Sequence, residues 1–180
     1  MTLISTIRSR PDIAEILSWP FGFQVDDGGV SVRRPQLAGE RAWRLVARDG
    51  TGGEYLVAAA DHGGDGALVY VSVDGRAGVI AADLAEGLAL VLSLPTWRHV
   101  LKYSAGGSLE AMRAAAPGLE AELVADEAGL ETRRAAALDA LGLVRLADPV
   151  GLLYRNVIEH TGTHRAADVR GQALASLFGG

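Results

Sequence analysis

The sequence predicts an α+β protein in which an antiparallel β meander of five to six strands is packed by helices and followed by a helical C-terminal half. Between residues 21 and 81, short stretches of β-branched and aromatic residues alternate with Asp-Gly pairs, a pattern typical of strands joined by tight turns. An acidic helix start follows directly at Asp83. From Ser108 onward the chain is rich in Ala, Leu and Glu, which favour helices.

The chain is expected to form a single domain over residues 1–180. Its 180 residues are enough for one core, and the 49% hydrophobic content is that of an ordinary globular protein. We expect residues 1–107 to form a helix, the sheet and the helices that pack on it. Residues 108–180 are then a helical extension of the same domain.

The N-terminal half begins with a helix over residues 11–17, because apolar side chains recur there at helical spacing and Trp19-Pro20 ends it. The expected turns are Asp27-Gly28, Asp49-Gly50, Asp65-Gly66 and Asp74-Gly75. In the strand at 43–48, Trp43, Leu45 and Ala47 alternate with Arg44, Val46 and Arg48, which predicts one buried and one wetter face. The last strand is expected at residues 76–81.

The residues that follow this strand, from Asp83 to Pro95, are predicted to form a capped helix. Asp83 and Glu86 are three residues apart and resemble a capping box. One apolar face is formed by Leu84, Leu88, Val91 and Leu92. Pro95 stops this helix, and Thr96 caps a further short helix over residues 97–103.

Helices dominate the C-terminal half. We expect them at 109–116, at 119–127 after a restart at Pro117, and at 131–141 with an end at Gly142. Asp148-Pro149 begins another that reaches about residue 159. The tail 164–180 forms a short amphipathic helix through Val169, Leu174, Leu177 and Phe178, or it frays.

Composition excludes several classes of function. The chain has no cysteine, so disulfides, thiolate metal sites and thiol catalysis are impossible. The net charge of −5 argues against a large nucleic-acid surface. Charges at the N-terminus break the apolar region that a signal peptide needs, and no apolar run spans a bilayer, so we expect a cytoplasmic protein without membrane contact. Of the 17 cationic residues only Lys102 is lysine, a bias that we assign to base composition.

No motif has the completeness of an active site, and we therefore expect no catalytic residue, metal or cofactor. The glycine-rich stretches lack the pattern of a phosphate-binding loop. His99 lies in the short helix beside Trp97 and Arg98, where we expect a packed or surface histidine and not a general base. It is the histidine to test if an activity appears. Two clusters offer metal ligands in loops: Asp61, His62 and Asp65, and Glu159, His160 and His164. A catalytic zinc site needs more support than either provides.

Acidic residues are concentrated in the helical half. Residues 108–141 contain seven acids against three arginines. One interpretation is a solvated helix face; the other is a surface complementary to a basic partner. The residues expected to bind a partner are Glu120, Glu122, Asp126, Glu127 and Glu131.

The order of parts over residues 68–103 resembles the SUKH superfamily of immunity proteins. The resemblance rests on a strand with "VYVSVDG", a strand with "AGVIA" and the helix "DLAEGLALVL". The early part differs, since Trp19-Pro20 and Asp27-Gly28-Gly29 only distantly match the superfamily's Leu-Pro and Asn-Gly-Gly signatures. The resemblance implies a bacterial protein that acts by binding and carries no catalytic residues.

The expected function is therefore protein binding, in the manner of an immunity protein that neutralises a polymorphic toxin domain. Two alternatives remain open at this point. One is a small metal-binding or ligand-binding protein, or an enzyme, that uses the loop histidines. The other is a structural or regulatory module of a homo-oligomer.

Overall fold

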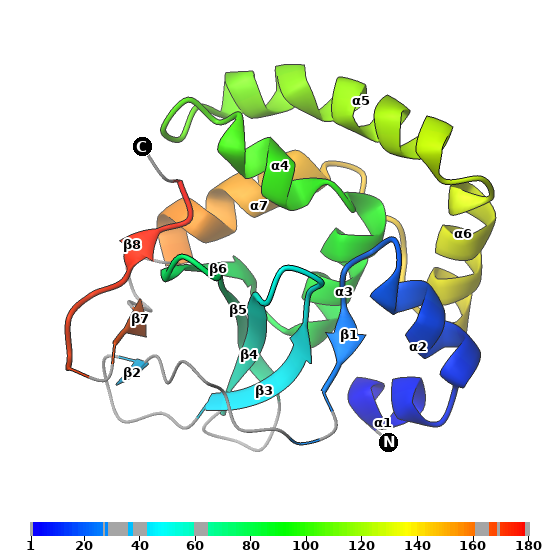
Figure 1. Cartoon of the computed structure of the whole chain (residues 1–180), viewed down its shortest axis with the longest axis horizontal. Coiled ribbons are helices and arrows are strands. Elements are labelled where there is room, and N and C mark those ends of the chain that lie inside the picture. Colours follow the sequence, from blue (N-terminus) through cyan, green and yellow to red (C-terminus); the bar gives the residue numbers. More distant parts are fainter. Residues whose placement is uncertain are drawn as a thin grey trace.

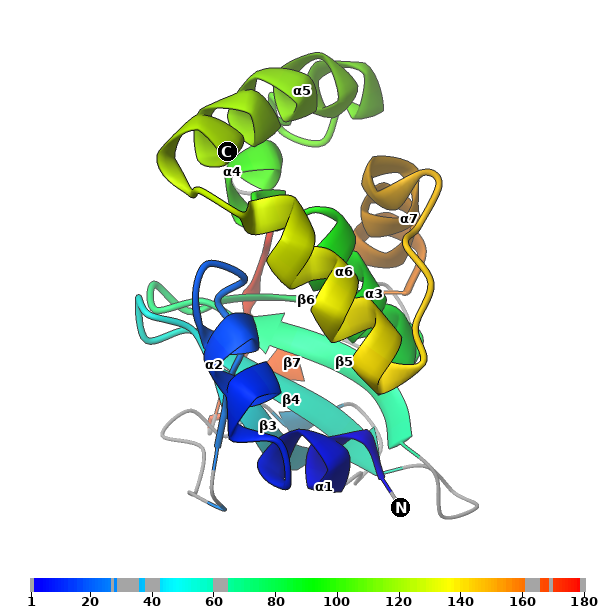
Figure 2. The same ribbon diagram turned by 90° about the vertical axis from the view of Figure 1, so that its right-hand side faces the viewer.

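A computed structural model describes residues 2–26, 28, 36–37, 43–59, 65–160, 166–168 and 170–178. In this part of the chain, one twisted sheet lies beside a layer of helices (Figures 1 and 2). The predicted class is confirmed: the protein is α+β, with a mostly antiparallel meander and a helical C-terminal half.

The larger sheet has six strands in the order β1-β3-β4-β5-β6-β8. They are β1 (Gln24–Val25), β3 (Trp43–Arg48), β4 (Glu54–Ala59), β5 (Asp65–Val71), β6 (Arg76–Ala81) and β8 (Ala175–Ser176). The first five pair antiparallel in turn, and β8 joins β6 in parallel. A separate two-stranded sheet pairs β2 (Gln36–Leu37) with β7 (Ala166–Ala167).

Two of the predicted Asp-Gly turns join neighbouring strands. Asp49 begins the turn from β3 to β4, where its Oδ1 accepts hydrogen bonds from the backbone N–H groups of Thr51 (2.8 Å) and Gly53 (2.9 Å). Asp74-Gly75 turns the chain from β5 to β6, and Gly75 has the positive φ of +81° that such turns require. Of the turn predicted at Asp27-Gly28, Asp27 lies outside the described residues.

The turn predicted at Asp65-Gly66 is wrong, because both residues belong to β5. The glycine has a different physical role there. A Cβ atom added to Gly66 would lie 2.8 Å from the carbonyl oxygen of Ala58 on the adjacent strand. The residue is therefore small because two strands approach closely, not because the chain reverses.

The predicted wetter face of β3 is confirmed at its two arginines, since Arg44 is exposed and Arg48 is partly exposed, but it is wrong at Val46 because both faces of the sheet carry a core. Val46 was expected on that face and is only 1% exposed. The pairing of β3 with β4 shifts between Leu45 and Ala47, and Val46 packs into the main core beneath the helices. A smaller cluster fills the opposite face: Leu45, Leu56, Val69, Val71, Ala77 and Val79.

Two consecutive helices, α3 (Leu84–Ser93) and α4 (Trp97–Lys102), follow β6. The predicted capping of α3 is confirmed, since Asp83 Oδ1 accepts a 2.8 Å hydrogen bond from the backbone N–H of Glu86. Its predicted apolar face, Leu84, Leu88, Val91 and Leu92, is buried. Thr96 occupies the N-cap position of α4, but its side chain makes no capping hydrogen bond because its backbone is close to helical there.

The N-terminal segment forms two helices rather than one. The predicted helix is α2 (Pro11–Ser18), which ends at Trp19 as expected. A further helix, α1 (Leu3–Arg8), precedes it and was not predicted. It buries Ile4 and Ile7, which are three residues apart and so share one face.

The C-terminal half contains α5 (Leu109–Asp126), α6 (Leu130–Leu141), α7 (Pro149–Arg155) and a π-helical turn, η1 (Asn156–His160). The predicted break at Pro117 is wrong, because α5 continues through it and follows a curved path (Figure 1). Pro117 is exposed, which lets the helix bend around it instead of ending. The predicted end of α6 at Gly142 and start of α7 at Asp148 are confirmed.

The tail does not form the predicted helix in its described part. Residues 175–176 form β8, which adds to the edge of the sheet beside β6. Leu174 packs against the smaller core, and Leu177 and Phe178 pack against the main one. Val169 lies outside the described residues. In the described ranges, no helix has the length and apolar character needed to cross a bilayer.

Candidate functional site

The five acidic residues predicted to bind a partner lie on α5, on α6 and in the turn between them, at the corner near the end of α2 (Figure 2). They do not form one face. A stripe of apolar side chains, Met112, Ala116, Leu119 and Leu123, attaches α5 to the core. At 100° per residue, Glu120 lies to one side of this stripe and Glu122 and Asp126 lie to the other.

Glu120 and Glu131 form ion pairs inside the protein. Both accept hydrogen bonds from the guanidinium of Arg134, which is only 1% exposed. Glu131 is also 2.9 Å from Arg145 Nη1. A buried guanidinium requires carboxylate partners, so both acids stabilise the fold. Glu120 connects α5 to α6, and Glu131 connects α6 to the segment that follows it.

Glu127 joins α5 to the N-terminal helices. Its Oε2 lies 2.9 Å from Arg133 Nη2, and its Oε1 accepts a 3.0 Å hydrogen bond from the indole Nε1–H of Trp19. The indole is thereby held while 63% of Trp19 stays exposed. Val124, 45% exposed, lies one turn before Glu127 on the same side of α5. We call Trp19, Val124 and Glu127 the Trp19 patch.

Glu122 and Asp126 are exposed, and within the described ranges neither makes a hydrogen bond or an ion pair. They are four residues apart and share one side of α5. Of the five predicted residues, these two are the ones whose charge is fully available to a partner.

The charge balance of α5 and α6 is negative after the internal ion pairs are counted. Each arginine on these helices has a carboxylate partner, including Arg113, which lies 2.7 Å from Asp148. Four exposed acids have no such partner among the described residues: Glu110, Glu122, Asp126 and Asp139. The excess of acid predicted from the sequence therefore remains at the surface, on two of the five expected residues, Glu122 and Asp126, and on Glu110 and Asp139.

The sequence analysis did not predict that Trp19 is an exposed residue of a candidate binding surface. It predicted only that Trp19-Pro20 ends the helix over residues 11–17. A tryptophan directly after an amphipathic helix and before a proline has no internal position in that helix, and this was the available signal. Its partner Glu127 lies 108 residues away, and such a contact cannot be read from local pattern.

The loop-histidine alternatives fall on residues outside those described. This holds for Asp61, His62 and His164, and for the side chains of Asp65, Glu159 and His160. Among the residues that are described, no group of three or more His, Asp or Glu side chains is arranged to hold a metal ion. His99 lies exposed on α4, beside two cations that are described below.

Comparison with protein-family models, with curated proteins and with solved structures found no match to this chain.

Proposed function

We propose that this protein binds a basic partner protein through the Trp19 patch, and that the exposed acids Glu122 and Asp126 on the other side of α5 attract the partner by their charge. In this proposal it acts as an immunity protein does, by covering and neutralising a toxin domain. The observation that carries the proposal is an indole that is 63% exposed and yet fixed by a hydrogen bond to Glu127.

A fixed, exposed tryptophan supports a protein-binding role on energetic grounds. Tryptophan is among the residues that contribute most to protein interfaces, because its large ring buries much apolar area. Holding the ring in place before binding reduces the entropy that is lost when the complex forms. Val124 extends the apolar area beside it.

The charge of the flanking helix supports a basic partner. Glu122 and Asp126 leave negative charge on α5 that no arginine of the helix neutralises. Such a surface attracts a positively charged domain over several ångströms and speeds its association.

The immunity role rests on the resemblance over residues 68–103. In the fold this stretch spans β5, β6, α3 and α4, which form the layer of strand and helix that supports the surface. Neutralisation by covering requires a complementary surface, about 800 Å² on each partner, and no catalytic group. A partner that is itself a basic nuclease or another toxic domain would fit this role.

The experiment is a capture of partners from lysate of the source cells with the tagged protein, at low and moderate salt. Wild type, Trp19→Ala and Tyr103→Ala are used in parallel. Tyr103 is 59% exposed at the end of α4 and serves as the matched exposed aromatic. We expect one basic protein, in equal amount to the bait, that binds wild type and Tyr103→Ala, is lost from Trp19→Ala and weakens as salt rises.

A captured partner that binds Trp19→Ala as well as wild type would place the interface elsewhere on the molecule. A partner of acidic character, bound equally at both salt concentrations, would contradict the electrostatic part of the proposal. If the partner is toxic when expressed alone, co-expression with wild type and not with Trp19→Ala should restore growth.

A further inference from the structure

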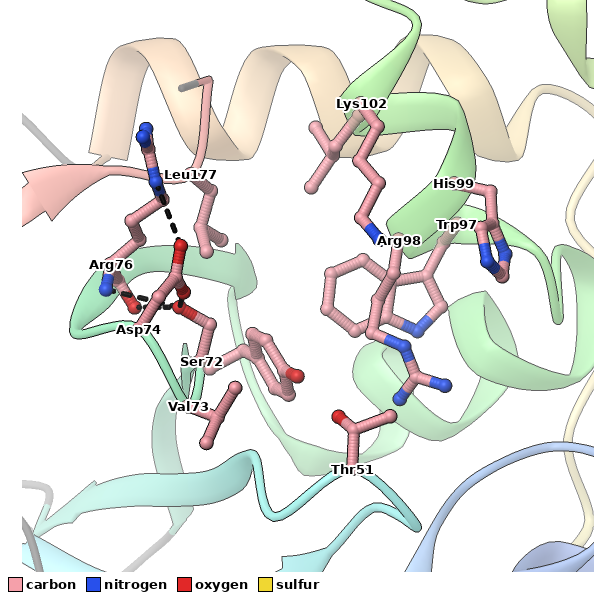
Figure 3. A pocket seen from close by; sticks show the side chains of 12 residues that line it. Thr51, Ser72, Val73, Asp74, Arg76, Trp97, Arg98, His99, Lys102 and Leu177 are labelled. Carbon is pink, nitrogen blue, oxygen red and sulfur yellow. Dashed lines mark hydrogen bonds and ion pairs between the residues drawn. The ribbon is translucent and has the colours of Figure 1, made fainter. Parts of the chain in front are cut away.

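A concave region, which we call the α4 groove, lies between α4 and the turn that joins β5 to β6 (Figure 3). It has a volume of about 630 Å³. Val73 and Leu177 are the apolar side chains that reach its surface, and Tyr70, Trp97 and Leu101 lie buried beneath it. Sites for small molecules usually enclose roughly 300–1,000 Å³ and combine an apolar lining with a few polar groups. None of the residues that line the groove belongs to the Trp19 patch.

One wall of the groove contains Arg98, whose guanidinium is held by a buried carboxylate. Arg98 Nη1 lies 2.6 Å from Oδ2 of Asp49, a carboxylate with no exposed surface. The hydroxyl of Tyr70 donates a 2.5 Å hydrogen bond to the same oxygen. The guanidinium also lies 5.7 Å from the centre of the Trp97 ring. These contacts hold Arg98 in position and compensate its charge.

The opposite wall contains a second compensated cation. Arg76 Nε lies 3.1 Å from Oδ2 of Asp74, which immediately precedes the Gly75 turn. Both residues border the groove on the side of the β5–β6 turn, where Figure 3 shows their ion pair. Two of the three permanent cations that line the groove therefore have carboxylate partners within the protein.

The third cation, Lys102, has no such partner among the described residues. It is the only lysine in the 180-residue sequence. Its side chain is exposed and extends from the last residue of α4 into the groove (Figure 3). An ammonium without a counterion gains energy when an anion binds next to it.

The neighbouring histidine responds to this positive charge. Partial burial lowers the pKa of His99, and the charges of Lys102 and Arg98 lower it further. The imidazole therefore lies close enough to Lys102 to be affected by its charge. It also supplies a spectroscopic probe, because an anion bound beside Lys102 would raise the pKa of His99.

We propose that the α4 groove binds a small organic anion, with its carboxylate or phosphate group on Lys102 and its apolar body against Val73 and Leu177. Lys102 forms the direct ion pair, and Arg98 is held by Asp49 in the wall beside it. A ring or short hydrocarbon body fits the volume together with the charged head. This site is independent of the protein-binding surface and does not rest on it.

The test is a titration of ¹⁵N-labelled protein, followed by NMR, with three probes that share one apolar body. They are 2-naphthoate, 2-naphthyl phosphate and the neutral 2-naphthamide. Each is added to wild type, to Lys102→Gln and to Arg10→Gln. Arg10 is an exposed cation between α1 and α2, so its variant has the same change in net charge as Lys102→Gln at a position away from the groove.

We expect at least one of the two anions to shift the signals of residues 97–102 and to raise the pKa of His99. Lys102→Gln should weaken anion binding about tenfold, the effect of losing one charge-assisted hydrogen bond, and should leave the amide unaffected. Arg10→Gln should bind like wild type. Tighter binding of naphthoate assigns the site to carboxylates, and tighter binding of the phosphate assigns it to phosphate monoesters.

The proposal is overturned if none of the probes shifts residues 97–102. It is also overturned if the amide binds as tightly as both anions, or if Lys102→Gln and wild type bind the anions equally. None of these outcomes affects the partner captured through Trp19, so the two proposals fail separately.

Discussion

The indole of Trp19 donates a 3.0 Å hydrogen bond to the carboxylate of Glu127, and this contact joins the end of α2 to the end of α5 across 108 residues of sequence. The same contact leaves most of the ring in solvent. Glu127 also pairs with Arg133 at the start of α6, so three helices meet at the indole. A ring that is held by this hydrogen bond and mostly exposed is available to a partner, which is the basis of the proposed function.

The paired and unpaired acids of α5 and α6 should differ in their effect on stability. Replacing Glu120 and Glu131 together by Gln leaves the buried guanidinium of Arg134 without a counterion. We expect this to lower the free energy of unfolding by about 3 kcal/mol, as measured by urea denaturation. The matched pair Glu122→Gln with Asp126→Asn should change it by less than about 0.5 kcal/mol. Equal losses in both double variants would contradict the separation of the acids into two sets.

Charge reversal at one unpaired acid should slow association with the captured partner. Asp126→Arg reverses the charge of the residue that precedes Glu127 at the end of α5, and Asp12→Arg makes the same change in net charge at the far end of α2. Stopped-flow or surface-plasmon kinetics should show a lower association rate for Asp126→Arg, with a smaller dependence on salt. If Asp12→Arg slows association to the same extent, net charge alone governs the encounter and the position of the acids is irrelevant.

The buried carboxylate of Asp49 should make stability depend on pH. Burial raises its pKa, but the hydrogen bond from Tyr70, the charge of Arg98 and the hydrogen bonds from Thr51 and Gly53 outweigh burial and lower the pKa below 3.8. A lowered pKa in the folded state stabilises the protein above the unfolded-state pKa, and the stabilisation is lost as pH falls through the folded value. The contribution is therefore complete at pH 7 and decreases below about pH 4.

Asp49→Asn isolates this contribution. At pH 7 we expect it to destabilise the protein by about 3 kcal/mol, because Arg98 loses its counterion. Near pH 3 the difference from wild type should be smaller, since wild type itself begins to lose the charged form. Urea denaturation at both pH values measures the two differences, and an equal difference at each would show that Asp49 does not titrate with folding.

Replacing each of two helical glycines by alanine should change the free energy of unfolding in opposite directions. A Cβ atom on Gly87 would lie 2.2 Å from Cδ2 of Leu68, where α3 packs on β5. Gly87→Ala is therefore expected to cost about 1–3 kcal/mol. Gly118, on α5, has nothing within 4 Å of the same position, so Gly118→Ala should stabilise the protein by about 0.5–1 kcal/mol. Thermal unfolding of the two variants distinguishes tight packing at α3 from open space at α5.

Features set by neighbouring residues were predicted well. The caps at Asp83 and Asp148, the left-handed end at Gly142 and the turn at Asp74-Gly75 each depend on a few adjacent positions. Errors occurred where one residue type has two physical uses. Gly66 permits close strand pairing instead of a turn, and Pro117 bends α5 instead of ending it.

The candidate sites were less predictable because they join distant parts of the chain. The sequence indicated an excess of acid on α5 and α6 but not which acids Arg134 would bind. The sequence predicted a turn at Asp49, but it did not predict the ion pair with Arg98, which is 49 residues away in the chain. Trp19 is notable in the sequence for its position directly after a helix, and Lys102 for being the only lysine. Only the fold shows that Trp19 bonds to Glu127 and that Lys102 borders the α4 groove.

The most direct test of the proposed function is the dissociation constant of the captured partner for purified wild type, Trp19→Ala and Tyr103→Ala, measured by isothermal titration calorimetry. Trp19→Ala should weaken binding by at least about 30-fold, the effect of removing an interface residue worth roughly 2 kcal/mol, and Tyr103→Ala should change it less than about twofold. A dissociation constant that is the same for Trp19→Ala as for wild type would show that the partner does not dock on the Trp19 patch.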